Sequence, residues 1–301
     1  MKSIHSNIKG IIILLTAAFV WGIAFTAQSA GSEHLGAFSY TAIRYAIGVL
    51  PLIPIAYFAE IRHRDTSKTK RSVLTGVLCG TVMFVAINFQ QFGIQLARNS
   101  GKAGFITCLY IIIVPLFGLF LKRYPTFNVW IGVVLAVAGM YMLTVKENSA
   151  VELGDILVMC SAVFWAVHIL VVDKFAADIH AVTFSAVQFI TVSLISSVFM
   201  FTIDNKVTIE AISSAWIPIL YGGLVSVAVG YTLQTIGQKY AKPVPASLAL
   251  SMESVFAAIA GAVILKENLG IRGYVGCAMI FSAIILAQLP EQWFRFTRKK
   301  K

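Results

Sequence analysis

The sequence predicts an all-α integral membrane protein in which ten transmembrane helices form two inverted five-helix repeats. Three observations lead to this prediction. Of the 301 residues, 58% are hydrophobic and only 12% are charged, and the mean hydropathy is +0.83. Ten apolar stretches approach the ~20 residues that a helix needs to cross a bilayer. The second half of the chain also repeats positions of the first half. Such a composition is typical of a multi-pass membrane protein.

The expected helices follow one another with only short polar turns between them, which leaves no room for a soluble domain. The ten stretches are expected at 9–29, 36–58, 72–94, 103–121, 127–145, 152–172, 181–203, 216–236, 245–265 and 271–289. The first stretch also has features of a secretory signal peptide, since Lys2 and Lys9 precede it and small residues follow it. Because its Trp21 has a counterpart in the sixth stretch, we favour a helix of the mature fold.

An internal repeat relates the first five stretches to the last five. Gln91, Gln95 and Ala103 return 143 residues later as Gln234, Gln238 and Ala246. At an offset of 144, the matching pairs are Gly10/Gly154, Ala18/Ala162, Trp21/Trp165, Lys122/Lys266 and Gly132/Gly276. Because each copy has an odd number of crossings, the second copy must enter the membrane upside down, as in many secondary transporters. We expect a first repeat at 9–145, a second at 152–289 and a basic tail at 290–301.

The net charge of +11 is explained by membrane orientation rather than by nucleic-acid binding. With the N-terminus inside, most of the 24 Lys and Arg residues fall in inner loops and in the C-terminal tail. The positive-inside rule therefore predicts that both termini are cytoplasmic. The tail could also touch anionic lipid, although its role as a topology signal is the simpler interpretation.

The sequence lacks the motifs of an ATPase, a zinc hydrolase or a serine hydrolase. Its four cysteines, at 79, 108, 160 and 277, fall inside expected helices without metal-ligand spacing, so they are interpreted as small packing residues. We therefore expect no catalytic residue, metal or cofactor. Transport by this chain would depend on a gradient or on exchange.

Two charged residues lie deep inside the expected helices. Glu253 lies eight residues into the ninth stretch, about 12 Å deep at 1.5 Å per residue. Intramembrane carboxyls are candidates for function, so Glu253 could exchange a proton as the cavity changes access; a structural hydrogen bond to a neighbouring helix is the alternative. Tyr110 stands at the equivalent position of the first repeat. Arg44 in the second stretch either reaches the interface or backbone carbonyls, or anchors an anionic group of a substrate; its repeat equivalent is Gln188.

Glutamines form a second group of polar candidates. Gln91 and Gln95, like Gln234 and Gln238, are four residues apart and share one helix face. Amide side chains either hold helices together or bind a polar substrate. Gln95 and Gln238 lie near helix ends, where holding or capping is favoured. Gln91 and Gln234 lie one turn deeper and are the better candidates for a substrate cavity.

The third group is aromatic. Trp21 and Trp165 lie about 12 residues into their stretches, away from the membrane interface where tryptophan usually anchors a helix. They are either core residues or a wall on which a planar substrate stacks. His168 lies one turn after Trp165 on the same face, whereas Ala24 stands at the equivalent position. His168 is therefore either a substrate contact or proton acceptor, or a structural histidine.

Several segments together resemble a known family. They are Trp21-Gly22-Ile23-Ala24-Phe25, Arg44, Gln95, Ala103-Gly104-Phe105-Ile106-Thr107, Gln238, Ala246-Ser247-Leu248, Glu253-Ser254-Val255-Phe256 and Lys266-Glu267. In this order they resemble the ten-helix EamA-type branch of the drug/metabolite transporter superfamily, over essentially the whole chain. The resemblance implies a carrier of small metabolites in the bacterial cytoplasmic membrane, with helices 1, 3, 4, 6, 8 and 9 around a central cavity. The family often has proline after the ninth-helix glutamate and early in helix 4, where this chain has Ser254 and a later Pro115.

We therefore expect a secondary transporter that exports a small organic, amino-acid-like metabolite by alternating access, coupled to protons or by exchange. Its partners are the substrate and the lipid bilayer. An importer of a vitamin or nucleoside-like compound is the nearer alternative, and a membrane enzyme or sensor is the alternative from another class. Glycine-rich spacings such as Gly132-x3-Ala136 and Gly222-x3-Ser226-x3-Gly230 allow either packing within one chain or a homodimer.

Overall fold

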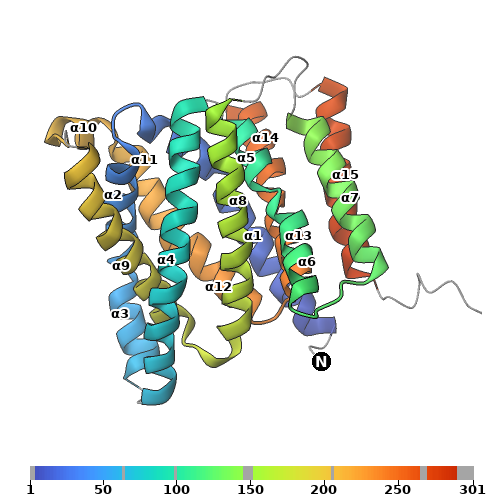
Figure 1. Ribbon diagram of the computed structural model, residues 1–301, viewed down its shortest axis with the longest axis horizontal. Helices are drawn as coiled ribbons and strands as arrows, with labels where there is room; N and C mark the ends of the chain where they lie inside the picture. Colours follow the sequence, from blue (N-terminus) through green and yellow to red (C-terminus); the bar gives the residue numbers. More distant parts are fainter. Residues whose placement is uncertain are drawn as a thin grey trace, which may run out of the picture.

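A computed structural model describes residues 4–62, 65–97, 100–144, 152–204, 207–264 and 270–289, and these parts of the chain are helical without any strand (Figure 1). The expected basic tail at 290–301 and the segment Lys266-Glu267 lie outside the described residues. The elements of the first half are α1 (Ile4–Ser32), α2 (Ala37–Val49), α3 (Leu52–Ala56), η1 (Tyr57–Ile61), α4 (Thr66–Ala97), α5 (Ser100–Thr107), α6 (Tyr110–Phe120) and α7 (Phe127–Thr144). The elements of the second half are α8 (Leu153–Phe175), η2 (Ala176–Asp178), α9 (Ala181–Phe199), η3 (Met200–Asp204), α10 (Ile209–Ser214), α11 (Trp216–Leu220), η4 (Tyr221–Tyr231), α12 (Thr232–Gln238), α13 (Pro243–Leu250), α14 (Met252–Ile264) and α15 (Gly270–Gln288).

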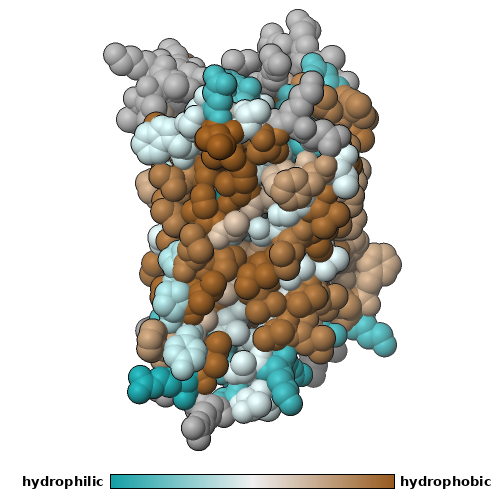
Figure 2. All heavy atoms as spheres, turned by 90° about the vertical axis from the view of Figure 1, so that its left-hand side faces the viewer, coloured by the Kyte–Doolittle hydropathy of each residue, from teal (hydrophilic) through white to brown (hydrophobic). Residues whose placement is uncertain are grey.

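These elements combine into ten apolar spans, numbered here in chain order. Within the described residues, nine spans are long enough to cross a membrane, and the fifth, Phe127–Leu143, is slightly shorter. The other nine are Asn7–Ser32, Ala37–Ala59, Thr66–Ala97, Lys102–Phe120, Leu153–Asp178, Ala181–Asp204, Trp216–Gln238, Pro243–Ala260 and Gly270–Ala287. Hydrophobic residues cover the middle of the face in Figure 2, and hydrophilic residues gather toward its two ends. This distribution suits a surface surrounded by lipid, so the ten-helix membrane fold is confirmed.

Packing between helices follows the internal repeat. A Cβ atom on Gly10 of α1 would lie 2.9 Å from the carbonyl oxygen of Gly237, and one on Gly154 of α8 would lie 2.8 Å from the carbonyl oxygen of Gly93. Both contacts allow two backbones to approach closely, which only glycine permits. The two contacts map onto each other at an offset of 144 residues. The repeat in the sequence is therefore also a repeat of helix packing.

The two repeats run in opposite directions through the molecule. Gln91, near the end of α4, donates a hydrogen bond to the hydroxyl of Ser32 at the end of α1 (2.6 Å). Gly93, half a turn further along α4, contacts Gly154 at the beginning of α8. The beginning of α8 therefore lies at the same level as the end of α1. This antiparallel relation is the inversion that the odd number of spans predicts.

Carboxylates on spans 2 and 7 cap each other's first turns. Asp204, at the end of η3, accepts hydrogen bonds from the backbone N–H and the hydroxyl of Ser39 (2.7 and 2.6 Å). Glu60, in η1, accepts the same pair of bonds from Thr183 (2.7 and 2.8 Å). Both pairs are related by the 144-residue offset, and both place a negative charge at a helix N-terminus, where the helix dipole is favourable. They tie α2 and α9 together at both ends.

These reciprocal caps are expected to contribute to stability. We predict that Asp204→Ala and Glu60→Ala each lower the free energy of unfolding by about 1 kcal/mol, because each leaves first-turn N–H groups without an acceptor. Thermal unfolding of the purified protein in detergent measures the loss. Asp178→Ala is the matched control, since Asp178 pairs with Arg71 at an exposed site (3.2 Å) and such pairs contribute little. Equal effects of all three substitutions would contradict the prediction.

Between two repeat-related packing contacts, span 8 contains one residue more than span 3, and a π-helix accommodates it. A Cβ atom on Gly223 would lie 2.7 Å from the carbonyl oxygen of Arg44, and one on Gly80 would lie 2.7 Å from the carbonyl oxygen of Gln188. Gly80 and Gly223 are thus related by an offset of 143 residues, whereas Gly93 and Gly237, further along the same two spans, are related by an offset of 144. The extra residue falls within η4, and π-helical segments commonly arise from one inserted residue near functional sites.

Spans 4 and 9 are interrupted near the middle of the molecule. Residues 108 and 109 form a turn between α5 and α6, and Ser251 forms one between α13 and α14. Neither interruption contains proline, since Pro115 lies inside α6. The small residues of spans 5 and 8 pack within the chain, Gly132 against Ala283 and Gly230 against Trp21.

Candidate functional site

A cavity lies between the two repeats, and spans 1, 3, 4, 6, 8 and 9 contribute its lining. The lining residues are Trp21, Ala24, Phe25, Gln28, Gln90, Thr107, Tyr110, Trp165, Ile169, Ser226, Tyr231, Gln234, Leu250 and Glu253. The helix interruptions of spans 4 and 9 and the π-helix of span 8 border this space. Its free volume is about 30 Å³, which suits one or two water molecules. The cavity is thus constricted to a free volume too small for a metabolite.

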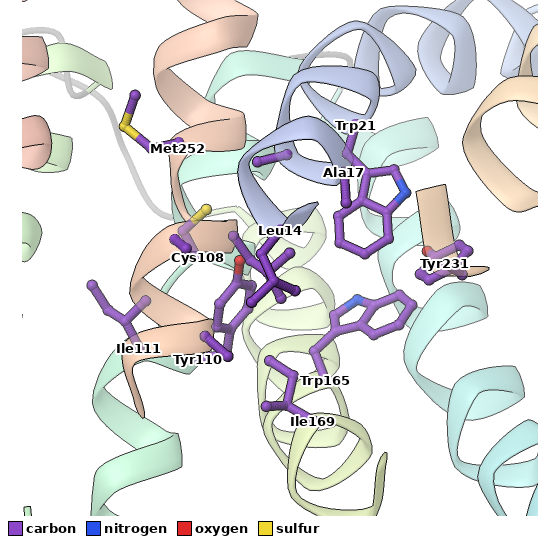
Figure 3. Close-up of a cluster of buried hydrophobic side chains, with 14 of the residues drawn as sticks. Leu14, Ala17, Trp21, Cys108, Tyr110, Ile111, Trp165, Ile169, Tyr231 and Met252 are labelled. Atoms are coloured by element: carbon purple, nitrogen blue, oxygen red, sulfur yellow. The ribbon is translucent and has the colours of Figure 1, made fainter. Parts of the chain in front are cut away.

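Three aromatic rings form one wall of the cavity. The ring centroid of Tyr231 lies 4.5 Å from that of Trp21 and 5.7 Å from that of Trp165, with the second pair nearly parallel. Figure 3 shows the two indoles one above the other beside Tyr231, with Tyr110 on the opposite side. Trp21 donates from Nε1 to the carbonyl oxygen of Ser226 (3.2 Å). The Nε1 of Trp165 has no hydrogen-bond partner among the described residues.

Glu253 is the carboxyl group of the cavity. Its Oε1 accepts from the hydroxyl of Tyr110 (3.3 Å) and from the thiol of Cys108 (3.2 Å). All three side chains are buried. Tyr110 and Glu253, which the sequence relates through the repeat, are therefore in contact across the interface between the repeats. The role of Cys108 as a donor to this carboxyl is not visible in the sequence.

Of the four glutamines singled out in the sequence, only Gln234 lines the cavity. Its Oε1 is buried without a partner among the described residues. Gln91 instead donates to Ser32 and to the carbonyl oxygen of Gln28 (3.1 Å), which places it behind the cavity. Gln90 takes its place in the lining and donates to Thr107 (2.9 Å). The 144-residue offset explains this difference, because it pairs Gln234 with Gln90.

The other two glutamines lie away from the cavity. Gln238 donates to the carbonyl oxygen of Ile169 in span 6 (2.8 Å), so it connects two helices. Gln95 is half-buried near the end of α4.

His168 also lies outside the cavity lining. It is fully buried, its Nε2 is 3.2 Å from Oε1 of Gln188, and its ring meets the edge of Trp165 at a centroid distance of 5.6 Å. This arrangement fits a buried polar pair that supports the tryptophan from behind.

Arg44 is buried instead of reaching the membrane interface, with 1% of its surface exposed. Its guanidinium lies over the rings of Tyr40 and Tyr45, at 5.0 and 5.3 Å from their centroids. Its NH2 group donates to Oε1 of Gln28 (3.4 Å). Gln28 lines the cavity, so one amide side chain separates this cation from the cavity. The sequence contains no pattern that singles out Gln28.

These features define a class of protein. Two inverted repeats border a small, constricted cavity, to which both contribute aromatic and polar side chains near the interruptions of their helices. This organisation is that of membrane transporters with inverted repeats. The particular family follows from comparison with known proteins.

The chain belongs to the EamA-like transporter family, which matches residues 8–145 and again residues 152–289. An uncharacterised transporter of Archaeoglobus fulgidus is 24% identical over 282 residues, covering 92% of this chain and 84% of the relative. The threonine/homoserine exporter RhtA of Escherichia coli strain K12 is 29% identical over 271 residues, covering 86% of this chain and 84% of the exporter. A protein of known crystal structure with 18% identity shares the fold, with a TM-score of 0.78 over 96% of this chain and 99% of that one.

Proposed function

We propose that this transporter exports a small amino acid or an amino-acid-like metabolite by alternating access. The observation that carries the proposal is the constricted cavity between two inverted repeats. A volume of about 30 Å³ cannot hold such a molecule. The repeats must therefore move relative to each other before a substrate enters, and inverted repeats can exchange inward-open and outward-open shapes around one site.

The chemistry of the lining supports an amino-acid-like substrate. The faces of Trp21, Trp165 and Tyr231 offer the negative electrostatic surface that attracts an ammonium group. Glu253 in the same cavity offers a carboxyl group to the same end of the substrate. The unpaired Nε1 of Trp165 and Oε1 of Gln234 offer one donor and one acceptor for polar substituents. The likeness to threonine/homoserine exporters supports the same substrate class.

Coupling to protons is assigned to Glu253. It is the carboxyl group of the cavity, and its partners Tyr110 and Cys108 donate to it from span 4. A carboxyl group that is exposed first to one side of the membrane and then to the other can carry a proton in the direction opposite to the substrate. Exchange of one substrate molecule for another uses the same cavity.

The proposed location is the bacterial cytoplasmic membrane, with both termini on the cytoplasmic side. The turns at 121–126 and 176–180 lie on one end of the molecule, because Arg123 pairs with Asp173 and Arg71 with Asp178. This end carries the basic residues that the positive-inside rule places in the cytoplasm. A cysteine at Thr126 is expected to react with a membrane-impermeant maleimide in disrupted cells and to stay unlabelled in intact spheroplasts. Labelling in intact spheroplasts would show that the orientation is the opposite of the proposed one.

Transport is tested with the purified full-length chain in liposomes. Vesicles preloaded with unlabelled threonine are expected to accumulate external radiolabelled threonine or homoserine by exchange, and a proton gradient is expected to drive net movement. Empty vesicles are the control. Accumulation no greater than in empty vesicles, across a panel of amino acids, would reject the proposed function.

A further inference from the structure

The interior of the protein holds a cation without a counter-charge. Arg44 is buried within span 2, and no carboxylate of the described residues lies within salt-bridge distance of it. Its Nε has no hydrogen-bond partner there either. The faces of Tyr40 and Tyr45 offset part of the cost of burying the charge. A buried charge without a counter-charge is nevertheless costly, and in a membrane protein it marks a candidate functional site.

Gln28 connects this cation with the cavity. Its carbonyl oxygen accepts hydrogen bonds from Gln91 (3.1 Å) and from the hydroxyl of Ser32 (2.8 Å), which fixes its backbone at the end of span 1. Its Oε1 accepts from Arg44 (3.4 Å). An amide whose oxygen faces a cation is polarised, so its N–H groups become stronger donors. Gln28 thereby transmits the positive charge of Arg44 to the surface of the cavity.

The repeat shows that this charge belongs to one half of the protein only. At the position of Arg44, the second half carries Gln188, whose Oε1 lies 3.2 Å from His168. At the position of Gln28, the second half carries Val172, which packs in the hydrophobic core. The pair of Arg44 and Gln28 therefore occurs in the first repeat only, and it makes the cavity electrostatically asymmetric. The carboxyl group of the cavity, Glu253, has its own donors in span 4.

We propose that Gln28 and Arg44 recognise a carboxylate group of the substrate. Gln28 Nε2 donates to the carboxylate, and Arg44 acts as a positioning residue that holds the amide and supplies the charge. This inference rests on the proposed transport function and deepens it, because it names the group by which the substrate is selected. A zwitterion would place its carboxylate at Gln28 and its ammonium group near Glu253 and the aromatic wall.

The test compares ligands that differ only in this group. Binding of threonine and of threoninamide, in which a neutral amide replaces the carboxylate, is measured by tryptophan fluorescence of the purified full-length chain. Two variants are compared with the unmodified protein. Arg44→Gln removes the charge and installs the residue of the second repeat. Gln28→Glu places a carboxylate next to Arg44, which neutralises the cation within the fold and repels an anionic ligand. Arg71→Gln removes one charge from the exposed pair with Asp178 and is the control.

The unmodified protein and Arg71→Gln are expected to bind threonine at least about tenfold more tightly than threoninamide, as a charge-assisted hydrogen bond implies. Arg44→Gln and Gln28→Glu are expected to lose this preference while they still bind threoninamide. Equal affinities of the unmodified protein for both ligands, binding of neither ligand, or an equal loss for both ligands in Arg44→Gln would overturn the inference. A variant that does not fold leaves the first comparison in force. Failure of the proposed function has a different signature, namely ligand binding without exchange in liposomes.

Discussion

Glu253→Gln is expected to abolish transport driven by a proton gradient while exchange of substrate continues. The glutamine keeps the size of the side chain and an oxygen that can accept from Tyr110 and Cys108. It cannot bind and release a proton at any pH at which the protein is folded. Net movement driven by a pH gradient should therefore fall to the background of empty vesicles. Exchange needs no proton transfer, so it should retain the same order of magnitude as in the unmodified protein.

The measurement is uptake of radiolabelled threonine into liposomes under two regimes, a pH gradient with no internal substrate and internal substrate with no gradient. Tyr110→Phe is the matched control, because it removes one hydrogen bond to Glu253 and leaves the carboxyl group in place. It should slow gradient-driven transport without abolishing it. Undiminished gradient-driven transport in Glu253→Gln would remove the proton role of this residue. Loss of both regimes would assign it a structural or binding role instead.

The fold could be predicted because its signals are local and repeated. A bilayer demands long apolar helices, so hydropathy alone locates all ten spans. The recurrence of Gly10 and Trp21 as Gly154 and Trp165 shows the duplication, and the odd count of five spans makes it inverted. The interruptions at residues 108–109 and at Ser251 were not predictable in this way, because no proline or charge marks them.

The cavity could be predicted in part. Trp21, Tyr110, Trp165, Gln234 and Glu253 all line it. Gln91 does not, because the sequence pairs it with Gln234 at an offset of 143, whereas packing at this level follows an offset of 144. A shift of one residue turns a helical side chain by about 100°, enough to move it from the cavity to the back of the helix. The extra residue in the π-helix η4 is a feature of backbone geometry, and no residue type in the sequence indicates it.

Contacts between residues on different helices could not be predicted from the sequence either. The side chains of Arg44 and Gln28 meet across the turn that joins spans 1 and 2, and Cys108 reaches Glu253 because the interruptions of spans 4 and 9 meet. Such pairs depend on how helices dock, which periodicity within one helix does not determine. His168 illustrates the converse: its position in the sequence left a ligand contact and a structural role open, and its contact with Gln188 in span 7, which makes it part of a buried pair, depends on how the helices dock.

The two repeat-related tryptophans are expected to differ in what they do. Both line the cavity and contact the ring of Tyr231, yet Trp21 uses its Nε1 to bind the carbonyl oxygen of Ser226, whereas the Nε1 of Trp165 is unpaired among the described residues. A buried donor without a protein partner is costly unless a ligand or water uses it. We therefore expect Trp165 to be the tryptophan that donates to the substrate, and Trp21 to be the one that holds span 1 against span 8.

Trp165→Phe is expected to raise KM for threonine about tenfold, which corresponds to about 1.4 kcal/mol for one lost hydrogen bond to a polar group of the substrate. Its thermal stability should change little, because phenylalanine keeps most of the ring surface against Tyr231. Trp21→Phe should show the opposite pattern, a loss of about 1 kcal/mol in the free energy of unfolding with a smaller change in KM. Initial rates of exchange in liposomes and thermal unfolding in detergent, measured on both variants, separate the two effects. If the two substitutions changed KM and stability in the same proportion, the two halves of the cavity would share one role, and the distinction drawn from the free indole nitrogen would be wrong.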